Sequence, residues 1–361
     1  MPTRKAAAHG LFELRLVQGP PGGRGRLTLP VAVDAMGGDR APREIVAGAL
    51  LARDELGIDV LLVGPDDGTL GDTRGLPVLD AREVIAMDED PARSVRTKKD
   101  SSLVRCAEAV RDQRASAMVS AGNTGAAMAS ALLRMGRISG VARPAIATPL
   151  PVYGAHPSIL IDAGANAECT ADWLLQFAQM ATAYVRARYA NANPSVALLS
   201  IGEEPTKGNT LVKESHELFA RTEGVNFIGN VEGRDLLLGK ADIIVTDGFT
   251  GNVALKSLEG AAATFDSMLR SAVNSSLSAR IAGLILKPAL APYVRSVDPE
   301  NTGGAMLLGV EGVCIISHGS SSARAIKNAI STAHEMVSHG LVEQVRSAIG
   351  SPAGSNQHFG G

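Results

Sequence analysis

The chain has 361 residues, 45% of them hydrophobic, which is long enough to bury one large core or two lobes. A formal net charge of −2 creates no overall field that attracts nucleic acid, so we expect no nucleic-acid partner. The three cysteines lie far apart and form no CxxC pair, which argues against a disulfide framework and fits a reducing cytoplasm. No apolar run approaches the roughly 20 residues of a membrane span.

Strands and helices alternate along the predicted fold. Residues 1–29 contain a Gly- and Pro-rich segment without a core-forming pattern, so we expect a flexible N-terminal extension. Apolar runs predict strands at 31–34, 60–63, 77–80, 115–119, 143–151, 158–162, 196–201, 226–228, 241–246 and 312–316. Helical patterns occupy 41–56, 101–113, 126–135, 170–189, 211–222, 231–238, 252–276 and 323–339. This alternation predicts an α/β domain over residues 30–346, with a mostly parallel sheet flanked by helices, and a flexible tail at 347–361.

Six polar, glycine-rich loops follow predicted strands. They span residues 33–39, 119–126, 161–166, 199–209, 245–252 and 316–322. In a parallel sheet the carboxyl ends of the strands meet at one edge, so we expect all six loops to build one site there. Glycines let the backbone approach a ligand, and the helix that follows offers free N–H groups to an oxyanion such as phosphate. For any single loop, an ordinary strand-to-helix turn is the favoured interpretation, and the repetition of six such loops is what points to a site.

Phosphate-binding candidates are the small and polar residues of these loops. They are Asp34, Gly37, Gly38, Ser120, Gly122, Asn123, Thr124, Asn166 and Ser320. Lys207 lies in a loop bounded by two glycines, where a lysine can bind an anion or neutralise a developing oxyanion. A lysine that simply faces solvent is the alternative interpretation.

Other chemistries lack their sequence signatures. The histidines form no HxH or HxxxH pair, and the loop aspartates are surrounded by glycines and hydroxyls, so we expect no metal. There is no GxSxG elbow, and Cys169 has no neighbour that would activate its thiol. Neither GxGxxG nor GxxxxGK[ST] occurs after the first strand or elsewhere in a suitable context, so we expect no nucleotide cofactor.

The loops together resemble those of the bacterial phosphate acyltransferases of phospholipid synthesis. The matching stretches are 33–39 with 41–42, 120–126, 162–166, 207–209, 227–230, 245–252 with 255–256, and 318–321. The strings DAMGGD at 34–39 and TDGFTGN at 246–252 are the most specific. The chain departs from the family at two places. Arg40 stands where the family usually has His, and residues 302–306 are TGGAM where the family commonly has YGGAP.

This resemblance implies a fold similar to isopropylmalate dehydrogenase and phosphotransacetylase. It implies reversible acyl transfer from acyl carrier protein to inorganic phosphate, without a cofactor, by a cytoplasmic homodimer that associates peripherally with the membrane. A membrane glycerol-3-phosphate acyltransferase would then use the acyl phosphate. Three alternatives remain: a phosphotransacetylase acting on acyl-CoA, an NAD-dependent hydroxy-acid dehydrogenase on the same fold, and a non-catalytic membrane-docking scaffold.

The residues of the loops suit that reaction. Phosphate is already a nucleophile, so the protein must hold it beside a thioester and stabilise the tetrahedral oxyanion. We expect Lys207, with Asn209 or Asn252, to stabilise the oxyanion. We expect Asp247 to orient Lys207 or phosphate, and His318 to handle a proton.

One apolar segment lies outside the six loops. Residues 278–294 contain Leu284, Ile285 and Leu286 between basic residues, and two prolines interrupt the segment afterwards. One interpretation is a helix end and loop buried in the core or in a dimer interface. The other is a surface tip that contacts lipid headgroups, with basic flanks attracted to anionic phospholipid.

Overall fold

The computed structural model describes residues 29–296 and 298–350. Apart from Leu29, the predicted N-terminal extension lies outside the described residues, as do residues 351–361 of the predicted tail. Helix α10, Leu341–Gly350, continues past the predicted domain boundary at 346. No helix in the described part of the chain is both long and apolar enough to cross a bilayer.

The described residues form one 11-stranded sheet, in the order β3-β2-β1-β4-β11-β10-β5-β6-β9-β7-β8. Its strands are β1 Val31–Asp34, β2 Val60–Gly64, β3 Val78–Asp80, β4 Ala117–Ser120, β5 Ala145–Leu150, β6 Ser158–Ile161, β7 Ser195–Ser200, β8 Asn226–Glu232, β9 Ile243–Val245, β10 Ala305–Leu308 and β11 Val313–Ile316. Most neighbours pair in parallel, so the predicted fold class is confirmed.

Strand direction reverses in the middle of the sheet. β10 is antiparallel to both β11 and β5, and β5 is antiparallel to β6. The strands β1, β2, β3, β4 and β11 therefore run in one direction, and β6, β7, β8 and β9 run in the other. The expectation that all six loops leave the same edge of the sheet is wrong, because β5 is antiparallel to β6 and the strands beyond it run the opposite way. β10, which the sequence did not predict, is antiparallel to both of its neighbours and so leaves β5 parallel to β11.

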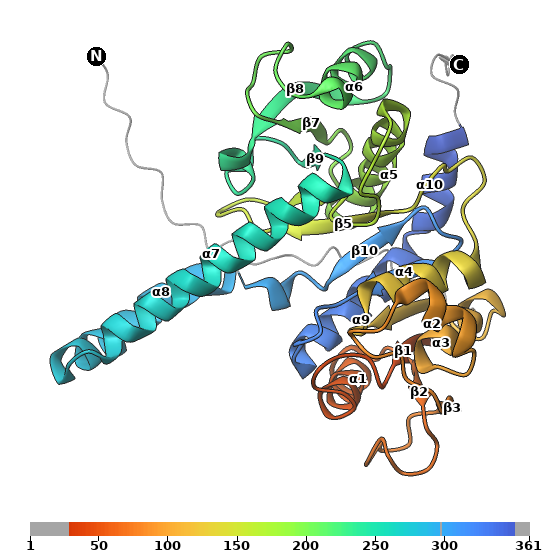
Figure 1. Cartoon of the computed structure of the whole chain (residues 1–361). Helices are drawn as coiled ribbons and strands as arrows, with labels where there is room; N and C mark the ends of the chain where they lie inside the picture. The colour runs from red at the N-terminus through yellow and green to blue at the C-terminus, as the bar shows by residue number, and fades with distance from the viewer. Residues whose placement is uncertain (1–28, 297, 351–361) are drawn as a thin grey trace, which may run out of the picture.

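Helices cover both faces of the sheet (Figure 1). They are α1 Arg43–Leu56, α2 Pro91–Thr97, α3 Ser102–Arg111, α4 Thr124–Ser130, α5 Ala171–Tyr189, α6 Thr210–Ala220, α7 Gly248–Asn274, α8 Leu277–Ser296, α9 Ala323–Ser338 and α10. One core contains residues of α1, α5, α6, α9 and α10, and the other contains residues of α2, α3, α4 and α7. Val31 and Val33 belong to the first core and Ala32 to the second, as the alternation of side chains along a strand requires.

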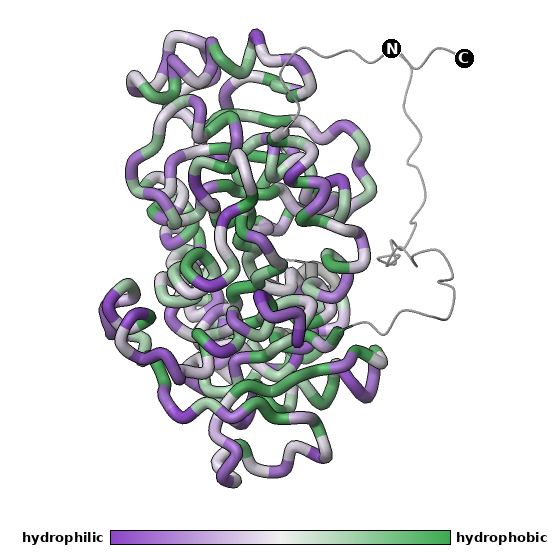
Figure 2. The backbone as a smooth tube through the Cα atoms, turned by 90° about the vertical axis from the view of Figure 1, so that its right-hand side faces the viewer, coloured by the Kyte–Doolittle hydropathy of each residue, from purple (hydrophilic) through white to green (hydrophobic). Residues whose placement is uncertain are grey.

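Hydrophobic stretches of the backbone gather in the interior, and hydrophilic stretches lie on peripheral loops (Figure 2). The strands β1, β2, β4, β6, β9 and β11 are buried along their whole length. A strand buried on both faces has no polar alternation, which is why these strands appear as short continuous apolar runs.

Two local predictions are wrong. The predicted helix at 231–238 is replaced by the end of β8 and a 3-10 turn at Gly233–Asp235, because Val231 and Glu232 pair with β7. The prolines at 288 and 292 do not interrupt the segment after 278, since α8 is a continuous helix that packs against α7.

Helices α7 and α8 form a long hairpin that projects from the rest of the molecule (Figure 1). Gly283 of α8 faces Val273 of α7, where a Cβ on the glycine would lie 2.7 Å from a valine methyl carbon. Leu284, Ile285 and Leu286 are 70%, 72% and 54% exposed, so this chain alone does not bury them.

The first turn of α7 packs directly on the loop after β6. Gly248 N donates to Asn166 O at 2.7 Å, and a Cβ on Gly251 would lie 1.9 Å from Asp162 O. Only glycine allows this approach of helix to backbone. The glycines of the TDGFTGN string are therefore required by packing as well as by any contact with a ligand.

We predict that Gly251→Ala lowers the free energy of unfolding by at least ~2 kcal/mol, because the new methyl group overlaps the Asp162 carbonyl. Gly260→Ala is the matched control in the same helix, since nothing lies within 4 Å of its Cβ position. That control should gain ~0.5–1 kcal/mol from helix propensity. Urea denaturation measures both, and equal stability of the two variants would contradict the packing described.

Candidate active site

Three of the six loops meet around Asp34, at the carboxyl ends of β1, β4 and β11. Asp34 Oδ2 accepts from Ser120 Oγ at 2.7 Å, and the same hydroxyl oxygen accepts from Gly122 N at 3.0 Å. Burial raises the pKa of the Asp34 carboxyl, and hydrogen bonds from Ser102 and Ser120 oppose that shift. Asp34 is 2% exposed. Its carboxyl group braces the two loops internally and does not face solvent.

Glycines let these loops approach one another. A Cβ on Gly37 would lie 2.4 Å from Asp34 Oδ2 and 2.8 Å from Gly122 N. Gly38 has a φ of 106°, and its Cβ would lie 2.9 Å from Gly319 O. The predicted convergence of glycine-rich loops is therefore observed for these three strands. We call this group the Asp34 cluster: Asp34, Gly37, Gly38, Ser120, Gly122, His318 and Ser320.

Asn123 is occupied by structural contacts. Its Oδ1 accepts from Ala126 N at 3.0 Å, which caps α4. Its Nδ2 lies 3.0–3.3 Å from the carbonyl oxygens of Ala86, Met87 and Glu89. Both ends of the side-chain amide are thus used to hold the loop before α2 against the start of α4.

His318, Ser320 and Thr124 are exposed at the rim of this cluster. His318 Nδ1 lies 3.2 Å from Ser320 N, which can only donate, so Nδ1 is an acceptor. Ser320 Oγ lies 2.8 Å from the same nitrogen. Neutral His318 therefore carries its proton on Nε2, which leaves a donor available to a molecule at the surface.

A second group forms at the carboxyl ends of β6 and β9. Asp162 is fully buried, and its carboxylate accepts backbone hydrogen bonds from Ile146, Gly164, Ala165 and Asn166 and one from Asn166 Nδ2. Burial raises the pKa of Asp162, and these bonds, led by the one from Ala165 N, oppose the shift. Asn166 Nδ2 also donates to Pro144 O at 2.8 Å, so its amide nitrogen is fully used.

Two predicted site residues lie at the start of α7, and they differ in how their side chains are used. Asp247 accepts from Thr250 N and from Thr250 Oγ1, both at 2.8 Å, and caps the helix. Asn252 is exposed and faces Gly164, whose Cβ would lie 3.6 Å from the Asn252 side chain. Of the two, Asn252 has the freer side chain for a ligand.

Lys207 lies on the loop after β7, at the same edge as the loops of β6 and β9. Its side chain is exposed and forms no ion pair with the described residues, while the nearby Glu203 pairs with Lys240 at 2.8 Å. Asn209 caps α6 by accepting from Val212 N at 3.0 Å. Lys207 thus presents a free ammonium group, and Asn209 is engaged by the helix backbone.

The geometry sorts the predicted residues into three kinds. Asn123, Asn209 and Asp247 cap helices, and Asp34 and Asn166 hold loops together, as does Asp162, one of the loop aspartates. The exposed polar groups that cap no helix are Thr124, Lys207, Asn252, His318 and Ser320, and the capping residue Asn209 is exposed as well. Each of the three caps comes directly before its observed helix but two to five residues before the helical pattern predicted from the sequence, so the capping role was not recognised there.

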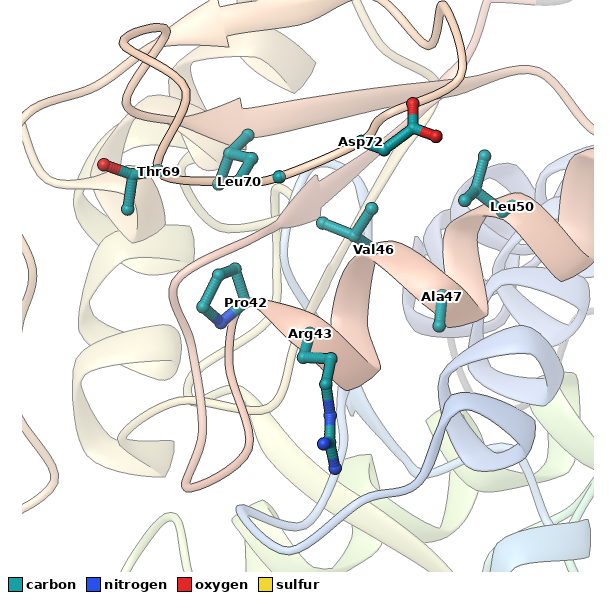
Figure 3. Close-up of a pocket in the computed structure, with 9 residues that line it drawn as sticks. Pro42, Arg43, Val46, Ala47, Leu50, Thr69, Leu70 and Asp72 are labelled. Atoms are coloured by element: carbon teal, nitrogen blue, oxygen red, sulfur yellow. The ribbon is translucent and has the colours of Figure 1, made fainter.

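A surface pocket of about 330 Å³ lies elsewhere, between α1 and the loop at 69–72 (Figure 3). Pro42, Val46 and Leu50 line one wall, and Leu70 and Asp72 line the other. None of the predicted site residues lines it. Among the described residues, no three His, Cys, Asp or Glu side chains gather as a metal centre would require.

Solved structures with the same fold include two acyl-transfer enzymes. A phosphotransacetylase from Streptococcus pyogenes superposes with a TM-score of 0.57 at 16% identity, covering 88% of this chain and 94% of that chain. A branched-chain phosphotransacylase from Enterococcus faecalis gives 0.56 at 16% identity, covering 86% and 99%. At this identity the likeness establishes the fold alone.

Sequence relatives are much closer. The phosphate acyltransferase of Dictyoglomus turgidum is 47% identical over 317 residues, covering 86% of this chain and 94% of the relative. That of Heliobacterium modesticaldum is 48% identical, covering 88% and 97%. The family model described as "Fatty acid synthesis protein" matches residues 29–344. Matched along almost all of its fold, the chain belongs to the phosphate acyltransferase family of fatty acid synthesis proteins.

Proposed function

We propose that the protein transfers a fatty acyl group from acyl carrier protein to inorganic phosphate, giving acyl phosphate and free carrier protein. Family membership carries this proposal, through relatives named phosphate acyltransferase that are 47–48% identical to the chain. The choice of carrier protein as the acyl donor rests on the resemblance of its loops to the enzymes of phospholipid synthesis.

The reaction needs little from the protein beyond positioning and charge stabilisation. A phosphate oxygen attacks the thioester carbonyl, and the carbonyl oxygen becomes an oxyanion. Collapse of this intermediate breaks the C–S bond, and the departing thiolate takes a proton. Lys207 and the Asn252 amide supply a cation and a donor for the oxyanion, and His318 Nε2 carries a proton for transfer.

The twist of the sheet supports a single site built from both groups of loops. Six steps separate β1 from β9 in the strand order. At roughly 20–25° a step, twist turns the strand direction by about 120–150°. Combined with the reversal between β11 and β6, this twist would turn the carboxyl ends of both halves toward the same side of the molecule. The Asp34 cluster would then hold phosphate opposite Lys207 and Asn252.

We predict that the purified protein consumes acyl carrier protein only when phosphate is present, and forms acyl phosphate that mass spectrometry detects. Treatment with EDTA should leave the rate unchanged, since no step uses a metal. Equal consumption with and without phosphate would disprove the reaction. Comparison of carrier-protein and CoA thioesters tests the phosphotransacetylase alternative, and absorbance of NADH tests the dehydrogenase.

Lys207→Ala should lower kcat by ~10²-fold, the scale for loss of one donor to an oxyanion. Lys213→Ala is the matched control, because Lys213 is an exposed lysine six residues later on α6 and should give wild-type kinetics. Steady-state kinetics with varied phosphate measures both variants. A folded Lys207→Ala variant with wild-type kcat would show that Lys207 merely faces solvent.

We also propose that the α7–α8 hairpin contacts the membrane. The exposed Leu284, Ile285 and Leu286 lie between Arg280 and Lys287, so the surface combines apolar side chains with cations that attract anionic lipid. In a homodimer two hairpins would bind one surface together, and effective concentration would strengthen a weak contact. The protein would then be a peripheral membrane protein of the cytoplasm, close to the membrane glycerol-3-phosphate acyltransferase that uses its product.

The double variant Leu284→Glu with Leu286→Glu should no longer sediment with anionic liposomes, while acyl transfer in solution persists. Leu133→Glu is the control, because Leu133 is 51% exposed on a different part of the molecule. Liposome binding by the double variant would exclude lipid contact through these residues. Loss of dimerisation in that variant, seen by light scattering, would instead assign the segment to a dimer interface.

A further inference from the structure

The loop that carries Lys207 is held by a buried amide from the neighbouring strand. Glu204 O accepts two hydrogen bonds, both at 3.0 Å: one from Lys207 N and one from Asn230 Nδ2. Asn230 is 7% exposed and belongs to β8. The backbone turn that sets the direction of Lys207 is thus anchored to β8 at one carbonyl oxygen.

A bulge in β8 sets the direction of the Asn230 side chain. The pairing of β7 with β8 steps from Val196↔Phe227 to Leu198↔Asn230, so β8 contains one extra residue. Gly229 has a φ of 102°, as a glycine at such a bulge does. In a regular strand residue 229 would oppose Leu198. The bulge instead places Asn230 on the same face as Phe227, toward α6.

His216 of α6 fixes the orientation of the amide. Its Nδ1 lies 3.1 Å from Asn230 Oδ1, and its ring makes an edge contact with Phe227 at a centroid distance of 5.0 Å. Because the Glu204 carbonyl oxygen can only accept, the amide nitrogen of Asn230 must face it. The amide oxygen then accepts from His216 Nδ1. Both Oδ1 and Nδ2 of Asn230 therefore have a hydrogen-bond partner.

A second contact to the same loop is weaker. Lys240 Nζ lies 2.8 Å from Glu203 Oε1 and 2.9 Å from Asp235 Oδ1. The Glu203 side chain is 56% exposed, and solvent screens such surface ion pairs so that they hold a loop only weakly. A buried amide left without its hydrogen-bond partner costs more free energy than a broken exposed ion pair. Asn230 is therefore the principal anchor of the loop.

We propose that Asn230 is a positioning residue for Lys207: its amide holds the Glu204 turn so that the ammonium group points at the reacting centre. This inference rests on the proposed function, since it assigns Lys207 a role in the chemical step. Asn230 does not touch the substrate. It acts by fixing the geometry of a group that does, where a displacement of about 1 Å can cost 10²-fold in rate.

The test is a double-mutant cycle between Asn230→Asp and Lys207→Ala. The carboxylate in Asn230→Asp has no hydrogen to donate to Glu204 O, so kcat should fall at least ~10-fold while KM for the acyl donor stays within ~2-fold. In the Lys207→Ala background the same substitution should change kcat by less than ~2-fold, because there is no ammonium group left to misplace. Additive losses would overturn the proposal, since they would mean that Asn230 acts independently of Lys207.

Asn226→Asp is the matched control. Asn226 lies on the same strand, and its Nδ2 also donates to a backbone carbonyl, that of Asn193, at 3.1 Å. This variant should keep wild-type kcat, so a general effect of placing a carboxylate on β8 is separated from the specific one.

Hydrogen exchange provides a readout that does not depend on activity. The Lys207 amide should exchange faster in Asn230→Asp than in wild type or Asn226→Asp, because its acceptor turn is released. Unchanged exchange would overturn the proposal whatever the enzyme does. If exchange responds but wild-type protein forms no acyl phosphate, the proposed reaction fails, and with it the role given to Lys207.

Discussion

Reversal of strand direction at β10 and β5 is the constraint on which the arrangement of the molecule depends. Because β10 is antiparallel on both sides and β5 is antiparallel to β6, the two parallel halves of the sheet point in opposite directions. A uniformly parallel sheet of this width would accumulate twist and turn its outer strands away from one another. The reversal offsets much of that twist between β1 and β9. In the proposed reaction, this offset would let the two loop groups, separate in sequence and in the sheet, act on one substrate.

Within each group of loops, some polar side chains hold the backbone through hydrogen bonds, and others are exposed to solvent. The buried carboxyl groups of Asp34 and Asp162 are surrounded by donors from their own loops, and Asn123, Asn209 and Asp247 cap the helices that follow. Lys207, Asn252 and His318 are exposed on loops and a helix start that these contacts hold in place. Such a division suits a reaction in which phosphate is already nucleophilic and the protein mainly orients and stabilises charge.

Much of the fold could be predicted from the sequence, because buried parallel strands are short apolar runs and amphipathic helices separate them. β10 was missed since four apolar residues between two glycine-rich turns resemble loop as much as strand. The end of β8 was mistaken for a helix because its pairing with β7 is a long-range contact that overrides local preference. The sequence identified candidate residues by their type and position, but not the hydrogen bonds that each one makes. Whether an Asn or Asp caps a helix or faces a ligand depends on side-chain direction, which spacing alone does not determine.

The close fit of α7 against the Asp162 loop determines how far the turn of the hairpin lies from that loop. The helix has 27 residues, so at 1.5 Å a residue it extends about 40 Å from the glycines that fix its first turn to the turn of the hairpin. Because those glycines fix the first turn of α7 on the Asp162 loop, the helix sets the spacing between that loop and the turn of the hairpin. A molecule standing upright on lipid by its hairpin tips would hold its loops several nanometres above the headgroups. An acyl phosphate released there would cross an aqueous gap before reaching the bilayer, unless the hairpin lay flat along it.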